Sequence, residues 1–133
     1  MLIISLPVPP SSNMAYRNVP GVGRVKTSDH KAWKREAGII AKLQFRQQGS
    51  PVIGKPYRMM IKVNINRRGD IMNREKLLTD LLVELGIIPD DCWCDEITIY
   101  RSPHIPGCEV RIKEMGPESG ASGPATQRGS GPK

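Results

Sequence analysis

The segment Asn66–Leu82 reads NRRGDIMNREKLLTDLL, and it holds both the main fold signal and the main chemical signal of this chain. Before it, residues 57–66 alternate between apolar and polar side chains, which predicts a half-buried strand. Leucines then recur at helical spacing, at Leu77, Leu78, Leu81, Leu82 and Leu85. Gly86 follows as a helix stop. The segment is therefore predicted to join a strand to an amphipathic helix from about Ile71 to Leu85.

An acidic residue lies at the start of this helix inside a cationic cluster. Asp70 is surrounded in sequence by Arg67, Arg68, Arg74 and Lys76. Such a carboxylate can hold a divalent cation against a nucleic-acid phosphate, while the cations anchor the phosphodiester and the metal activates water. A second acidic pair, Asp90-Asp91, follows the helix and could converge on the same site. The pattern favours a metal-dependent nuclease, although Asp70 taken alone is more simply explained as a helix N-cap.

The remaining elements are expected on both sides of this segment. Leu2–Leu6 predicts a short strand, and Ser28 is the expected N-cap of a helix that ends near Gln48. The buried face of that helix is expected to hold Trp33, Ala37, Ile40 and Ala41, with Ile39 and Leu43 beside it. Two further strands are expected at Glu96–Arg101 and Cys108–Lys113. The predicted fold is one compact α/β domain over residues 1–115, in β-α-β-α-β-β order, with a mixed sheet and two helices.

Residues 11–26 are polar and interrupted by glycine and proline, so they are expected to form a loop. Its side chains suited to contacts with sugar and phosphate are Asn13, Tyr16, Arg17, Arg24 and Lys26. An ordinary solvated loop explains the same residues equally well.

Composition limits what the chain can be. Its 133 residues suit one domain with a modest core, and residues 116–133 are rich in Gly, Ser and Pro, which predicts a disordered tail. The tail holds two of the 20 basic residues and one of the 13 acidic ones, so the domain keeps 18 and 12 and a charge of about +6. A basic domain favours polyanionic partners. With no apolar run of membrane length and no secretory leader, a cytoplasmic protein is expected.

Three cysteines and a histidine offer a different function. Cys92, Cys94, His104 and Cys108 could form a zinc site in a small regulatory protein. Their spacing differs from that of common zinc ribbons, in which two to four residues separate the paired cysteines, whereas a single residue separates Cys92 from Cys94. Two thiols that alternate at the start of a strand are ordinary core residues. The odd number of cysteines fits reduced thiols in the cytoplasm.

The motifs together resemble the RusA-type Holliday-junction resolvases (crossover junction endodeoxyribonucleases). The resemblance rests on LPVPPSSNMAY at residues 6–16, on Ser28 with Ala32-Trp33, on RRGDIMNREK at residues 67–76, and on GIIPDD at residues 86–91. These pieces occur in the family's order and at matching spacing, over about residues 2–115. It implies a small homodimeric endonuclease that cuts four-way DNA junctions with Mg²⁺. A two-fold junction that needs two symmetric nicks suits a two-fold dimer.

The resemblance also assigns roles to individual positions. Asp70 and Asp91 would be metal ligands, and with Lys76 they would form the catalytic set. The residues expected at the DNA are Ser11, Ser12, Asn13, Arg17, Asn66, Arg67, Arg68, Asn73 and Arg74.

One position departs from the family pattern. The second aspartate of the family's D-x-D-N motif falls on Met72 here, and a thioether is a poor ligand for a hard cation such as Mg²⁺. A metal site short of one hard ligand would need more Mg²⁺ or would prefer Mn²⁺. The competing hypothesis is therefore a protein that binds branched DNA with weak or no cleavage.

Overall fold

The computed structural model describes residues 1–11, 16–67 and 70–115. They form a four-stranded mixed sheet in the order β1-β6-β4-β5, a separate two-stranded hairpin, and two helices. The sheet strands are β1 (Leu2–Leu6), β4 (Tyr57–Val63), β5 (Cys94–Arg101) and β6 (Cys108–Glu114). The helices are α2 (Ser28–Gln47) and α3 (Met72–Glu84), and a short 3₁₀ turn, η1 (Asp91–Trp93), precedes β5. The predicted α/β class with two helices and a mixed sheet is confirmed.

The sheet topology follows from the connections. β4 and β5 are parallel, and α3 lies in the crossover between them, as a parallel pair requires. β6 pairs antiparallel with both β1 and β4. β4 alternates buried and exposed positions, because one face of the sheet meets the helices and the other carries charged side chains. β5 and β1 are the two edges.

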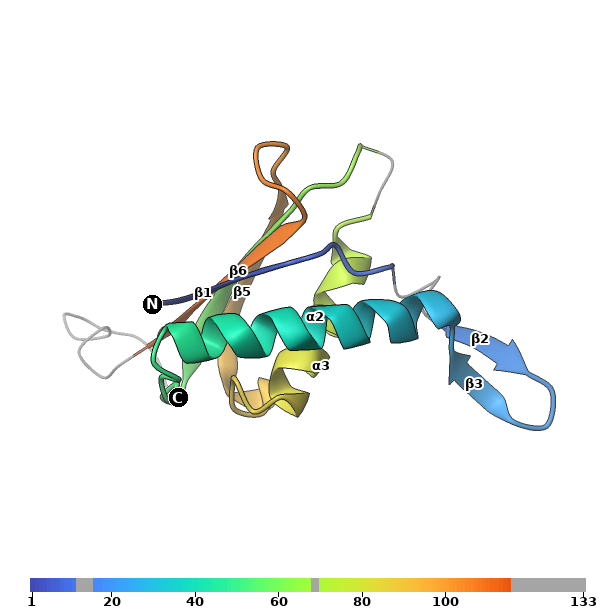
Figure 1. Ribbon diagram of the computed structural model, residues 1–133, viewed down its shortest axis with the longest axis horizontal. Helices are drawn as coiled ribbons and strands as arrows, with labels where there is room; N and C mark the ends of the chain where they lie inside the picture. The colour runs from blue at the N-terminus through green and yellow to red at the C-terminus, as the bar shows by residue number, and fades with distance from the viewer. Residues whose placement is uncertain (12–15, 68–69, 116–133) are drawn as a thin grey trace.

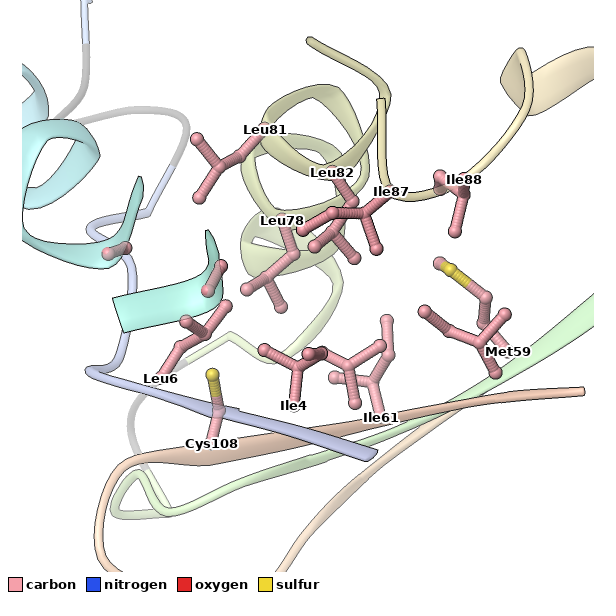
Figure 2. Close-up of a cluster of buried hydrophobic side chains, with 14 of the residues drawn as sticks. Ile4, Leu6, Met59, Ile61, Leu78, Leu81, Leu82, Ile87, Ile88 and Cys108 are labelled. Carbon is pink, nitrogen blue, oxygen red and sulfur yellow. The ribbon is translucent and has the colours of Figure 1, made fainter. Parts of the chain in front are cut away.

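The core lies between the sheet and the helices. Figure 2 shows α3 side chains, among them Leu78 and Leu82, above Ile4 and Ile61 from the strands. All four are essentially inaccessible to solvent. Gly86 ends α3 with a φ of 74°, a conformation that favours glycine, as the sequence indicated.

α2 runs along β1, and two glutamines, Gln44 in the helix and Gln48 at its C-cap, bind the β1 backbone. Gln44 accepts from the amide of Ser5 at 2.8 Å and donates to its carbonyl at 2.8 Å. Gln48 makes the same pair of bonds with Ile3, at 3.0 and 2.6 Å. The Trp33 indole adds a bond to the carbonyl of Pro7, at 2.8 Å. The outer edge of β1 is therefore closed by side chains of α2.

The loop predicted for residues 11–26 is wrong over most of its length. Residues 16–26 form an antiparallel hairpin of β2 (Tyr16–Val19) and β3 (Gly23–Lys26), so the element order is β-β-β-α-β-α-β-β. The hairpin extends away from the body beside the N-terminal end of α2 (Figure 1). Its polar residues do not alternate against a core, and for this reason the sequence pattern did not reveal it.

Smaller differences concern the helix ends and faces. Thr27, not Ser28, caps α2, through its hydroxyl and the amide of His30 at 3.3 Å. Ile39 and Leu43 are 67% and 53% exposed, so they lie outside the core. The disordered tail predicted for residues 116–133 lies outside the described residues. None of the described helices has the length and apolarity that crossing a membrane requires.

Candidate functional site

The segment between β4 and α3 is held from the neighbouring strand. The Arg101 guanidinium, at the end of β5, donates to the carbonyls of Asn66 and Arg67, each at 3.3 Å. Asn64, just after β4, binds the 105–107 turn through its side chain at 2.7 Å and through its amide at 2.8 Å. The chain therefore leaves the sheet at a fixed place before it reaches Asp70.

Asp70 is bound to the first turn of α3. One carboxylate oxygen accepts from the amide of Met72 at 2.9 Å, and the other accepts from the side-chain amide of Asn73 at 3.0 Å. Asp70 therefore binds the first amide of α3, although the N-cap position predicted for it is occupied by Ile71, one residue later. Each carboxylate oxygen has a second lone pair, so these bonds orient the group without consuming its capacity to bind a cation. The side chain is exposed.

Lys76 lies between two carboxylates from different elements. Its ammonium nitrogen is 3.3 Å from Asp80 on the next turn of α3 and 3.8 Å from Asp91 in η1. The Asp80 carboxylate chiefly, and Asp91 to a lesser extent, raise the pKa of Lys76. The structure therefore places Lys76 and Asp91, two of the three predicted catalytic residues, 3.8 Å apart.

A buried tyrosine of β4 holds the backbone just before η1. The hydroxyl of Tyr57 lies 3.2 Å from the carbonyl of Pro89 and 3.3 Å from that of Asp90. Burial raises the pKa of Tyr57 well above its ordinary value, so the hydroxyl stays protonated. The Asp90 carboxylate accepts from the amide of Cys92 at 3.1 Å, and this bond lowers the pKa of Asp90. Asp90 thus stabilises the turn that presents Asp91.

The residues proposed to contact DNA differ in exposure and in the contacts that they make. Arg17 and Asn66 are exposed, on the hairpin and on the loop before α3. Asn73 is engaged with Asp70, and Arg74 is half-buried and donates to the carbonyl of Pro9 at 2.6 Å. Arg74 therefore ties the segment after β1 to α3. Ser11 is half-buried and Arg67 is exposed, whereas Ser12, Asn13 and Arg68 lie outside the described residues.

Met72 projects into solvent. Its side chain is 66% exposed although it stands at the first position of α3. A methionine there gains nothing from burial, so it is not a packing residue.

Metal clusters are absent from the described part of the chain. No three His, Cys, Asp or Glu side chains gather there, and the four zinc candidates are all described residues. The zinc hypothesis is therefore wrong for Cys92, Cys94, His104 and Cys108. Cys108 is a core residue whose burial raises its pKa to about 12. Two exposed carboxylates, Asp70 and Asp91, remain as candidate Mg²⁺ ligands, which suits an ion that takes one or two carboxylates and keeps several waters.

Three supporting residues were not identified from sequence. Asp80 stands four residues after Lys76, a spacing that predicts an ion pair on one helix face and could have shown it. Arg101 and Tyr57 act through backbone carbonyls of distant loops. No sequence pattern marks contacts of that kind.

Comparison with known proteins gives a consistent answer. The family model for endodeoxyribonuclease RusA matches residues 7–113. Curated relatives include the crossover junction endodeoxyribonucleases RusA of Escherichia coli (strain K12), Enterobacteria phage 82 and Shigella sonnei (strain Ss046). Each is 29% identical over 119 residues, which cover 86% of this chain and 96% of the relative.

Proposed function

The chain belongs to the RusA endodeoxyribonuclease family, and from that premise we propose that it is a Mg²⁺-dependent endonuclease that cuts four-way DNA junctions. The observation that carries the proposal is the 3.8 Å distance between Lys76 and Asp91. Lys76 lies on α3, the helix whose first amide binds Asp70. The donor set fits the metal, because Asp70 and Asp91 are exposed hard oxygen donors.

Each group would have a distinct task. Asp70 and Asp91 would hold Mg²⁺, which supplies an activated water and polarises the scissile phosphate. In the free protein Lys76 offsets the charge of Asp91. With DNA bound, its ammonium would stabilise the negative charge that develops on the phosphate oxygens. Asp80 would keep Lys76 on this side of α3 through their 3.3 Å contact.

The assembly is proposed to be a homodimer. A four-way junction has two equivalent strands to cut, so two sites related by a two-fold axis place one site at each strand. Cleavage of both strands in one encounter would yield two duplexes that need only ligation. This fits a role in DNA recombination and repair.

One residue supports a second candidate function. Met72 occupies a family carboxylate position and is 66% exposed, so no buried role compensates for the lost ligand. The chain would then recognise branched DNA and cut it poorly at ordinary Mg²⁺ concentration. Mn²⁺, which accepts softer surroundings, would restore part of the rate.

The deciding experiment uses a synthetic four-way junction and a linear duplex of matched sequence, with Mg²⁺, Mn²⁺ or EDTA. We expect metal-dependent paired nicks in the junction alone. Asp70→Asn and Asp91→Asn should retain binding in EDTA and lose cleavage, because they keep the side-chain shape and remove the charge that holds the cation. Asp95→Asn, an exposed aspartate on β5, is the matched control and should cut normally.

The outcomes separate the hypotheses. Asparagine caps a helix as well as aspartate does, so full activity in Asp70→Asn would return that residue to a purely structural role. Junction binding with little cleavage in Mg²⁺ and more cleavage in Mn²⁺ would establish the second candidate function.

A further inference from the structure

A cationic groove lies between the two helices, and its described lining includes none of Asp70, Lys76 and Asp91. It has a volume of about 570 Å³. Its described lining includes five cations, Lys26, Lys31, Lys34, Arg35 and Lys42, and one acid, Glu84. Glu84 is already paired with Lys34 at 2.7 Å. The groove therefore carries a large excess of positive charge.

Two of these cations crowd each other. Lys34 lowers the pKa of Lys26, because two neighbouring ammonium groups repel. Glu84 compensates mainly Lys34, whose pKa it raises. An anion that binds beside Lys26 would relieve this repulsion, so the groove favours a negatively charged ligand.

The exposed cations form a line along α2. Lys31, Arg35 and Lys42 are spaced four and seven residues apart, which places them on one side of the helix. We call these three residues the α2 stripe. Lys31 and Lys42 are 11 residues apart, which corresponds to about 16 Å along the helix axis, or roughly five base pairs of duplex at 3.4 Å per step.

The stripe is continuous with the hairpin and with the proposed site. Tyr16 and Lys26, at the base of the hairpin, line a small cavity together with Asp80, the partner of Lys76. Arg24 stacks on the Tyr16 ring at 4.2 Å, and Arg17 is exposed on the same hairpin. Figure 1 shows the hairpin extending outward at the end of α2 where the stripe begins.

We propose that the α2 stripe and the β2–β3 hairpin form a second DNA surface, which holds the backbone of the duplex arm that leaves the cutting site. This proposal rests on the proposed function, because that function identifies the ligand as branched DNA. Phosphates that repeat along a duplex match cations that repeat along a helix. An acidic peptide would need only a local cluster of cations around the apolar part of the groove lining, which is formed by Ile39, Leu81 and Leu85.

The test measures how affinity depends on arm length. Four-way junctions with arms of about 6 and about 15 base pairs are titrated in EDTA by fluorescence anisotropy over a range of salt. The variant Arg35→Gln/Lys42→Gln removes two stripe charges with a residue that favours helix. The control, Arg58→Gln/Lys113→Gln, removes two exposed charges from strands of the sheet, on the face opposite the helices.

Wild type and the control should bind long arms more tightly than short ones. The stripe variant should lose this difference. With long arms, its slope of log affinity against log salt should fall in magnitude by about two, at ~0.9 per lost phosphate contact. With short arms its slope should match that of wild type.

Several results would overturn the proposal of a second DNA surface without contradicting the proposed nuclease activity. One is an unchanged slope in the stripe variant with long arms, and another is a wild type that is indifferent to arm length. Binding of an Asp/Glu-rich peptide with leucine anchors, lost in the stripe variant while DNA binding persists, would assign the groove to a peptide instead. Arm-length-dependent binding without cleavage in any metal would support the second DNA surface and contradict the proposed nuclease activity.

Discussion

For single residues, the sequence marks the candidate carboxylates but not the groups that position them. Asp70 and Asp91 are marked in sequence by the cations and turns around them. Their contacts depend on geometry that the sequence does not state. Asp70 binds the amide of Met72, and Asp91 meets Lys76 because Tyr57 holds the 89–90 backbone from the core.

Met72→Asp tests whether the site is short of a hard ligand. The added carboxylate should lower the Mg²⁺ concentration needed for half-maximal cleavage and reduce the advantage of Mn²⁺. Without metal, a third nearby carboxylate adds repulsion, so the variant should unfold at lower temperature and gain more stability than wild type when Mg²⁺ is added. Metal titration of cleavage and thermal unfolding measure the two effects. Met72→Leu is the control, and an unchanged metal requirement in Met72→Asp would refute the missing-ligand idea.

Asp80→Asn tests what holds the charge of Lys76. Asp80 contributes most to raising the pKa of Lys76, so the variant should titrate Lys76 at lower pH, and Asp91→Asn should shift it less. Because the folded-state pKa is raised, the stability from this contact is present below the unfolded pKa of about 10.4 and is lost as pH rises through the folded pKa. The ¹³Cε shift of labelled Lys76 reports the titration. Equal effects of the two variants would contradict this order.

At the scale of elements, periodic segments were predicted well and a solvated one was missed. α3 and β4 bury alternate or helically spaced apolar side chains, so their patterns follow the core. β5 begins at Cys94, two residues before the expected start at Glu96, because an edge strand has few buried positions to mark its beginning. In the β2–β3 hairpin only the end near Tyr16 packs against the core, and the other side chains are mostly exposed, so no apolar alternation marks the two strands.

The two glutamines of α2 offer a test at this scale. Gln44→Ala/Gln48→Ala removes four hydrogen bonds to β1, and the backbone groups left behind can bind water. We expect a loss of about 1–3 kcal/mol in the free energy of unfolding, since each such bond has a net value near 1 kcal/mol or less when exposed. Urea unfolding measures the loss. Gln47→Ala, an exposed neighbour on the same helix, is the control, and a double variant as stable as this control would show that the bonds contribute nothing.

At the scale of the whole molecule, the fold class and the single domain follow from the sequence, whereas the assembly does not. Among the described residues, β5 pairs with β4 and with no other strand. It contains the β-favouring run Ile97-Thr98-Ile99-Tyr100. If the proposed homodimer continues the sheet, β5 is the edge that would join the two copies.

Thr98→Lys tests this arrangement. A lysine on an edge strand disfavours pairing with a second chain, and here two copies would bring like charges together. The variant should be monomeric by light scattering where wild type is dimeric, with unchanged thermal stability of the monomer fold. Thr98→Val keeps the strand preference and serves as the control. A Thr98→Lys dimer as tight as wild type would place the interface elsewhere.

The glutamine bonds to β1 also limit how large any assembly can grow. A sheet with two open edges can add copies without end, and that is the route to fibres. Here the side chains of Gln44 and Gln48 occupy hydrogen-bonding groups of β1, so within the four-stranded sheet of the described residues β5 is the edge left for growth. If two copies pair through their β5 strands, both of these edges are occupied, and a third copy cannot pair with either of them. Gln44 and Gln48 would thus prevent a further copy from pairing with β1. Their loss should allow polymerisation as well as lower the stability of the fold.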